Sequence, residues 1–292
     1  MDHQAAKNGR FHRDQRTSVM QIGSNSASLM AVNALNSANA VVLKASERIS
    51  TGLRINRASD DPTGLMAANR FKTQITSMTK AIDNLSQGSA ATQIVDSSLS
   101  QMVEVLGNMR VAAVASQSST LSTSDRGGYQ DAIDAYVSEI DNIADNAVWN
   151  GSSLMNTASS MSVQASAQSG DTIAVSFQKV TSTQLSLGSL SMSSTSNASS
   201  AVTAIDAAIE TIGAYQSYMG AMSNVMTIQS DALTSVKTSY SGAYGNIMNA
   251  DLAQETANLA SGKIQRDAST AMLAQSQQMS REIVDFLLKS VQ

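Results

Sequence analysis

Three groups of residues in this chain could do chemistry: two histidines, a pair of aspartates and a pair of glycines. The histidines, His3 and His12, both lie near the start of the sequence. Histidine is the usual general base and a common zinc ligand, so no histidine-dependent base, triad or zinc site is expected in the folded body. The sequence has no cysteine, which removes disulfides, thiol catalysis and cysteine-bound zinc together.

The aspartate pair, Asp60 and Asp61, could suggest paired carboxylates for metal binding or acid–base work. However, Pro62 follows them and arginines lie nearby, and an acidic residue before a proline is typical of a helix N-terminus. We therefore favour a helix cap over a catalytic pair. The glycine pair at 127–128 lies in no phosphate-binding GxxxxGK[ST] pattern, and no HExxH motif is present. The sequence predicts no catalytic residue, no cofactor site, no metal site and no enzyme.

The segment that positions these aspartates, Glu47–Phe71, predicts a helix, a polar turn and a second helix. The first helix is expected to stop at Gly52, since glycine ends helices and Arg54 and Arg57 place cations near its carbonyl end. The next helix should start at Pro62, the only proline of the chain, where a missing N–H costs least. From these residues alone, an ordinary helix–turn–helix in a soluble bundle is the alternative.

The same segment, ERISTGLRINRASDDPTGLMAANRF, resembles the N-terminal signature of bacterial flagellins, the subunits that self-assemble into flagellar filaments. A second stretch at 264–290, IQRDASTAMLAQSQQMSREIVDFLLKS, is similar to the flagellin C-terminus. The resemblance covers residues 20–154 and 199–289. It implies a secreted structural subunit of the extracellular filament used for swimming, exported unfolded through the flagellar type III apparatus. It also implies an export chaperone, the filament cap and hook-junction proteins as partners, beside other copies of the chain.

Composition limits the other classes of function. Of 292 residues, 42% are apolar but only 4% aromatic and 14% charged, which favours closely spaced helices over a large globular interior. A formal charge of −4 gives no basic surface for nucleic acid. No stretch approaches the roughly 20 apolar residues that cross a bilayer, and the first residues lack the apolar core of a secretory signal peptide. Neither a nucleic-acid partner nor a membrane partner is predicted.

Seven-residue repeats predict long helices. A coiled-coil seam needs such a spacing, because 3.5 residues per turn keep one face on the partner helix. The spacing predicts helices over 198–250 and 62–115, and a shorter one after the Thr123–Asp125 cap region. The main stripe of the C-terminal helix consists of Ile205, Ile212, Met219, Met226, Leu233, Tyr240 and Ile247. A second stripe follows it by three residues and includes Val236. Gln229 interrupts the seam, and packing is expected to be imperfect there. We predict a mainly α fold, a long antiparallel helical bundle or coiled-coil rod with a small β-hairpin element.

The hairpin is expected in the serine-rich centre of the chain. Met161, Val163 and Ala165 alternate with polar residues, as do the residues from 173 to 177, and Ser169-Gly170-Asp171 lies between the two runs. In flagellins the centre is variable and faces outward, and here the variable region is short, at 156–197.

The two ends of the chain carry weaker amphipathic segments that are expected to order only on assembly, as a coiled coil of the inner tube. The predicted assembly interface consists of Leu35, Val42, Ile49, Leu53, Met272, Met279, Ile283 and Phe286. The hinge and signature residues are Gly52, Arg54, Asp60, Asp61 and Pro62. The predicted domains are a disordered extension at 1–19, terminal-helix segments at 20–61 and 251–292, and rod segments at 62–155 and 198–250 flanking the variable region. Family members usually begin near Met20.

Two other functions remain open from the sequence. A hook–filament junction protein shares flagellin-like ends but does not propagate into a filament. A secreted coiled-coil effector or translocator would carry an apolar membrane hairpin.

Overall fold

The computed structural model describes residues 26–290, and the predicted extension at 1–19 lies outside this range. The described residues form five helices and four short strands. They divide into two compact units. The rod unit comprises Thr63–Ile247, and the terminal-helix unit comprises the described residues up to Pro62 and from Met248 onward.

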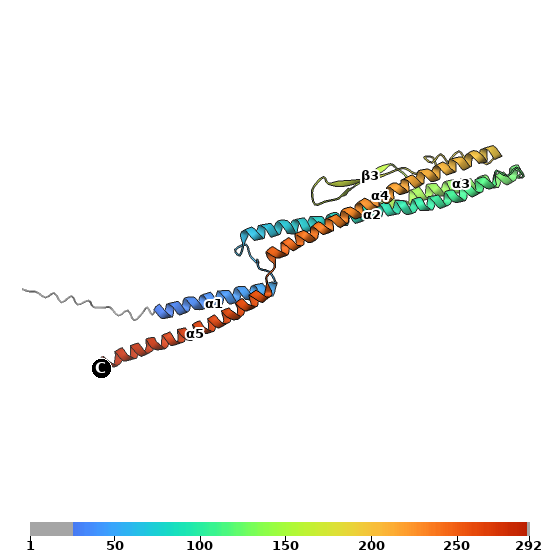
Figure 1. The fold of residues 1–292 in the computed structure, drawn as a ribbon. Helices are drawn as coiled ribbons and strands as arrows, with labels where there is room; N and C mark the ends of the chain where they lie inside the picture. The colour runs from blue at the N-terminus through green and yellow to red at the C-terminus, as the bar shows by residue number, and fades with distance from the viewer. Residues whose placement is uncertain (1–25, 291–292) are drawn as a thin grey trace, which may run out of the picture. The chain divides into compact units, whose positions relative to one another are not determined.

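Three helices build the rod unit: α2 (Pro62–Ala115), α3 (Thr123–Asn146) and α4 (Thr195–Met248). They run alongside one another in Figure 1 and contribute to one hydrophobic core. The bounds agree with the predicted helices at 62–115 and 198–250 to within three residues. The prediction of a mainly helical bundle is confirmed.

The heptad stripe of α4 is buried from Ile205 to Leu233, while Tyr240 and Ile247 are half-buried. Ile205, Ile212, Met219 and Met226 are each at most 1% exposed. Val236, which the sequence placed on a second stripe, is instead exposed. A straight helix drifts by about 20° per heptad relative to a strict seven-residue repeat, so positions at the margin of a stripe can turn toward solvent.

Gln229, which interrupts the seam, is half-buried and makes a hydrogen bond. Its Nε2 donates a hydrogen bond to the carbonyl oxygen of Ala165, 3.0 Å away. The polar residue therefore ties α4 to the segment that follows strand β3 (Ser159–Gln164). This contact satisfies the half-buried amide at a seam position.

The two helix ends that flank the turn between α2 and α3 are both capped by side chains. Ser122 caps α3 in a capping box with Asp125, and two hydrogen bonds to Ser122 lower the pKa of the Asp125 carboxyl. Arg126 is buried and donates to the carbonyl oxygens of Ser116 and Ser118, just beyond the C-terminus of α2. A cation is favourable there because the helix dipole places partial negative charge at that end.

The predicted hairpin is present. Strand β3 pairs antiparallel with β4 (Thr172–Phe177), and Gly170 in the turn has a φ of 89°. The Tyr215 and Tyr218 hydroxyls of α4 accept hydrogen bonds from the Gln178 and Ser176 amides, at 2.9 and 3.2 Å. The hairpin is thereby fixed along α4.

A second, smaller hairpin was not predicted. It pairs β1 (Val148–Trp149) with β2 (Ser152–Ser153). The turn residues Asn150 and Gly151 have φ values of 47° and 80°. Positive φ at both central residues is typical of a type I′ turn, for which Asn-Gly is the strongest short sequence signal. That signal was present in the sequence.

The terminal-helix unit consists of two antiparallel helices, α1 (Ser26–Thr51) and α5 (Leu252–Lys289). Two side-chain contacts follow this antiparallel order. Ser28, near the start of α1, forms a hydrogen bond with Ser276 in the second half of α5, and Arg48, near the end of α1, pairs with Glu255 near the start of α5. Asp251 caps α5 by accepting from the Ala253 and Gln254 amides. The predicted coiled coil of the two ends is therefore formed within one chain.

Candidate assembly surface

The seam between α1 and α5 is made of small residues at a seven-residue spacing. Such residues let two helix backbones approach closely. A Cβ added at Gly262 would lie 3.0 Å from Val42 Cγ2 and 3.2 Å from Val41 Cγ1. The buried positions are Ala31, Ala38 and Ala45 on α1 and Glu255, Gly262, Ser269 and Ser276 on α5.

The predicted interface residues of α1 lie along this seam. Leu35, Val42 and Ile49 are half-buried and alternate with the three alanines. Leu53, just beyond the end of α1, is also half-buried and forms an isolated antiparallel bridge with Asn249. The large side chains of α1 thus flank the small ones and leave part of their surface uncovered.

The predicted interface residues of α5 are exposed in the single chain. Met272 is 68% exposed and Phe286 is 72% exposed, and Met279 and Ile283 are exposed as well. Ile283 continues the seven-residue spacing of the buried stripe, and Met272, Met279 and Phe286 each follow a position of that spacing by three residues. Much of the surface of these four side chains is nevertheless uncovered in the single chain.

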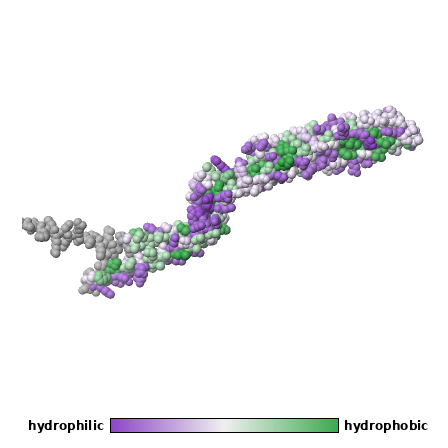
Figure 2. All heavy atoms as spheres, in the orientation of Figure 1, coloured by the Kyte–Doolittle hydropathy of each residue, from purple (hydrophilic) through white to green (hydrophobic). Residues whose placement is uncertain are grey.

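Further apolar side chains are exposed on the same two helices, among them Leu29, Met30 and Leu43 on α1 and Ile264 on α5. Green hydrophobic patches on this unit are visible in Figure 2. Contiguous exposed apolar side chains are typical of an interaction surface.

The apolar character of α1 also corrects one prediction. Among the described residues, this helix alone is long and apolar enough to cross a membrane, with a mean hydropathy of 1.2 over an 18-residue window. Alanines and valines raise the mean although the helix has few large apolar side chains. A single helix of this kind is weak evidence for a membrane span, since core helices of soluble proteins reach the same value.

One ion pair fixes the register of the seam. Arg48 Nη1 lies 2.8 Å from Glu255 Oε1, and Asn258 also donates to the Glu255 carboxylate. Burial raises the pKa of Glu255, but the hydrogen bonds from Arg48 and Asn258 and the positive charges of Arg48 and Lys44 outweigh it, so the pKa lies below its ordinary value. The buried carboxylate is therefore held in its charged form.

The predicted hinge residues form a short clamp where the two chain segments of this unit meet. Gly52 has a φ of 70°, and its amide donates to the Arg48 carbonyl at 2.9 Å, which ends α1 as predicted. The Arg54 amide donates to the Met248 carbonyl at 2.6 Å, and the Ala250 amide donates to the Gly52 carbonyl at 2.9 Å. These bonds hold the two segments side by side.

The aspartate pair belongs to the same clamp. Asp60 accepts hydrogen bonds from the Asn56 and Arg57 amides at 3.2 and 3.1 Å and lies 3.3 Å from Lys44 Nζ. These two amides, followed by Lys44, lower the pKa of the Asp60 carboxyl. Asp60 thus closes the loop before α2, and Asp61 directly precedes Pro62, the first residue of that helix. Within residues 26–290, no group of three His, Cys, Asp or Glu side chains could hold a metal ion.

Comparison with known proteins identifies the family of this chain. The model of the bacterial flagellin N-terminal helical region matches residues 22–160, and that of the bacterial flagellin C-terminal helical region matches residues 202–287. The chain belongs to the flagellin family. The two matched regions contain the whole of α2 and α3 and most of α4 and α5.

Individual flagellins agree with this assignment. A flagellin of Serratia marcescens is 35% identical over 166 residues, which are 57% of this chain and 47% of that protein. A phase 1 flagellin of Salmonella naestved is 34% identical over 166 residues, 57% of this chain and 33% of that protein. The matches therefore span less than half the length of these two relatives.

A solved structure designated a flagellar hook-associated protein, from Vibrio parahaemolyticus, shares the fold. It has a TM-score of 0.54 and 14% sequence identity, and the match covers 65% of this chain and all of that one. At this identity the likeness concerns the fold alone.

The small residues of the seam were missed from the sequence, although Leu35, Val42 and Ile49 were placed along it. Their signal was the seven-residue spacing of Ala31, Ala38 and Ala45, matched by Gly262 and Ser269 in α5. Small residues carry little weight in a search for apolar stripes, yet they permit the closest helix packing. A search for spaced small residues would have found this flagellin's seam.

Proposed function

We propose that this chain is a structural subunit that polymerises with copies of itself into a bacterial flagellar filament. Membership of the flagellin family supports this function. The observation that carries it is the exposed apolar surface of α1 and α5, which includes Leu43, Met272 and Phe286. A second copy of the chain is the occupant that fits, because the same surface is present on every copy.

The energetics favour polymerisation over a lone chain. Burying one Met, Ile, Leu or Phe side chain is worth about 1.5–3 kcal/mol. The exposed residues of α1 and α5 lie along both helices, so each copy added to a helical array buries several of them. An interface between different faces of identical copies gives a filament when the rotation from one copy to the next does not close into a ring.

The remaining parts of the proposal follow from the family. The subunit is exported through the flagellar type III apparatus, is extracellular in the filament and serves swimming. An export chaperone, the filament cap and hook-junction proteins are its further partners. The chain acts as no enzyme and requires no cofactor, nucleic acid or membrane partner.

A hook–filament junction protein is the second candidate, supported by the shared fold with the Vibrio hook-associated protein. The two candidates differ in one property. A junction protein forms a short ring and stops, whereas a filament subunit adds repeatedly to its own seeds.

Seeded growth tests the proposal. Purified full-length chain is mixed with sheared fragments of its own filaments, and fragment length is followed by electron microscopy. We expect long filaments whose growth depends on the concentration of added chain. Fragments that gain a single short ring would identify a junction protein, and fragments that never lengthen would overturn the filament assignment.

A further inference from the structure

The small β elements of the rod unit line two neighbouring grooves. Neither groove belongs to the terminal helices, through which the chain is proposed to polymerise. A groove of about 560 Å³ lies between the β1–β2 hairpin and the β3–β4 hairpin. A neighbouring groove of about 810 Å³ lies between the β3–β4 hairpin and α4. The two share Ser159, Ser160 and Phe177 as lining residues. Both volumes fall in the range of small-molecule sites, roughly 300–1,000 Å³.

The first groove combines an aromatic ring with uncharged polar groups. Trp149, the only tryptophan of the chain, lines it and is half-buried against the core. Its other lining residues are Asn150, Ser152, Ser153, Leu154, Thr157, Ser159, Ser160, Met161 and Phe177. None of these side chains is ionisable, so the groove offers no counter-charge to a charged ligand.

The polar groups of this groove are available to a ligand. The side chains of Ser152, Thr157, Ser159 and Ser160 are exposed and make no hydrogen bond to another group in the described part of the chain. A hydroxyl can both donate and accept, so these four residues can match the hydroxyls of a ligand in either sense.

The walls of the groove are held in place. The Leu154 amide donates to the Ala147 carbonyl at 2.8 Å, and Leu154 and Met155 are buried. The type I′ turn at Asn150 fixes the β1–β2 hairpin beside Trp149. A preformed site loses little conformational entropy when a ligand binds, which favours affinity.

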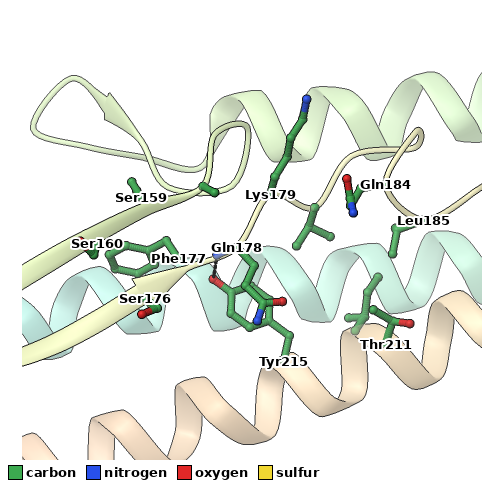
Figure 3. A pocket seen from close by; sticks show the side chains of 13 residues that line it. Ser159, Ser160, Ser176, Phe177, Gln178, Lys179, Gln184, Leu185, Thr211 and Tyr215 are labelled. Atoms are coloured by element: carbon green, nitrogen blue, oxygen red, sulfur yellow. Dashed lines mark hydrogen bonds between the residues drawn. The ribbon is translucent and has the colours of Figure 1, made fainter.

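The neighbouring groove is similar in character. Figure 3 shows Gln184 and Tyr215 among its lining residues, while Lys179 extends away from Tyr215. Lys179 is the only ionisable group of this lining besides the Tyr215 phenol. The Tyr215 hydroxyl is occupied by the Gln178 amide, and burial raises the pKa of Tyr215, so this phenol stays neutral.

We propose that the joined grooves bind a neutral oligosaccharide. A sugar ring presents a face of C–H groups, which packs on the electron-rich face of an aromatic ring such as Trp149. Its outward hydroxyls can bond to the serine and threonine side chains. The groove beside Trp149 has no ionisable side chain, and Lys179 of the neighbouring groove extends away from Tyr215, which favours a neutral ligand. The shared residues Ser159 and Ser160 let a ligand of several sugar units pass from one groove to the other.

Tryptophan fluorescence provides a specific readout, since Trp149 is the only tryptophan. Unpolymerised full-length chain is titrated with neutral trisaccharides of glucose, galactose, mannose and N-acetylglucosamine, and with trigalacturonic acid as an acidic probe. Isothermal calorimetry on the same samples detects binding that leaves the fluorescence unchanged. We expect at least one neutral trisaccharide to bind with a Kd of about 1 mM or tighter.

A matched pair of variants locates the site. Ser160→Gln fills the junction of the two grooves and should weaken binding at least about tenfold, a difference that calorimetry resolves. Ser162→Gln places the same side chain on the same strand, at an exposed position that lines neither groove, and should bind like the unmodified chain. Equal loss in both variants, binding of the acidic probe alone, or no binding of any neutral probe would each overturn the proposal. The result of the seeded filament growth experiment does not depend on any of these three outcomes, so the two proposals can fail separately.

Discussion

Arg48 and Glu255 lie 207 positions apart in the sequence, yet Arg48 Nη1 and Glu255 Oε1 are 2.8 Å apart in the structure. The pair crosses from the last turn of α1 to the first turn of α5. Glu255 is 7% exposed, so its carboxylate is stabilised in the charged form by its hydrogen-bond and ion-pair partners rather than by water. Removing one member of such a pair leaves the other buried without a counter-charge, which is costly.

This pair predicts acid sensitivity of the assembled form. The folded-state pKa of Glu255 is below its ordinary value of about 4.5. Its stabilising contribution is therefore complete above about pH 4.5 and is lost as pH falls through the lowered pKa. The sedimentable fraction of polymer, measured from neutral to acid pH, should fall in that window. Glu255→Gln should give weaker polymer at pH 7 whose stability changes less on acidification; an unchanged acid profile would exclude Glu255 as a contributor.

Phe286→Asp should abolish polymerisation and leave the rod unit folded. The ring is 72% exposed in the single chain, so the change costs the lone chain little. At an interface, the new carboxylate would lose its hydration at a cost of several kcal/mol. Sedimentation and electron microscopy measure assembly, and Trp149 fluorescence reports on the rod unit. Ile283→Asp is expected to behave in the same way.

Two controls accompany this change. Phe286→Leu keeps an apolar side chain and should still polymerise. Gln278→Asp adds the same charge to an exposed polar position of α5 and should have a smaller effect. Filaments of normal length from Phe286→Asp would place this side chain outside the interface.

Limited proteolysis of unpolymerised chain should remove the ends first. The α1 and α5 helices bury only narrow stripes of small residues against each other, while the rod unit buries a large core. Local opening is easiest where buried apolar contacts are few. We expect a resistant fragment close to Thr63–Ile247, identified by mass spectrometry. Ends that resist as long as this fragment would contradict ordering on assembly.

Two glycines of α2 should respond in opposite directions to alanine. A Cβ at Gly88 would lie 2.8 Å from Val163 Cγ2 and 2.8 Å from Met226 Sδ, and valine is too stiff to move away easily. Overpacking costs about 1–3 kcal/mol and should exceed the gain in helix propensity of about 1 kcal/mol. Gly88→Ala should therefore lower the free energy of unfolding of the rod unit.

Gly107→Ala is the matched change, because nothing lies within 4 Å of its added Cβ. It should stabilise the rod unit by up to about 1 kcal/mol. Urea unfolding followed by Trp149 fluorescence measures both variants. Destabilisation of similar size at both positions would show that packing at Val163 is not the cause.

The sequence by itself determined the helices of the rod and the main hairpin. Ile205, Ile212 and Met219 repeat at seven residues with no competing pattern, so the period fixes both the helix and its buried face. Pro62 and Gly52 mark helix ends through their own backbone preferences, which depend little on context. These features are local, so they can be read from neighbouring residues without knowledge of the tertiary contacts.

Tertiary structure alone decided which residues of α5 are buried against α1. Met272 and Phe286 are exposed, whereas Gly262 and Ser269 are buried, because two helices approach most closely where their side chains are smallest. The ion pair of Arg48 with Glu255 likewise depends on a register that no local pattern contains. The groove beside Trp149 arises where two hairpins meet, and its lining residues are scattered between positions 149 and 177. Long-range packing creates such contacts, and the residues that share them carry no common sequence signal.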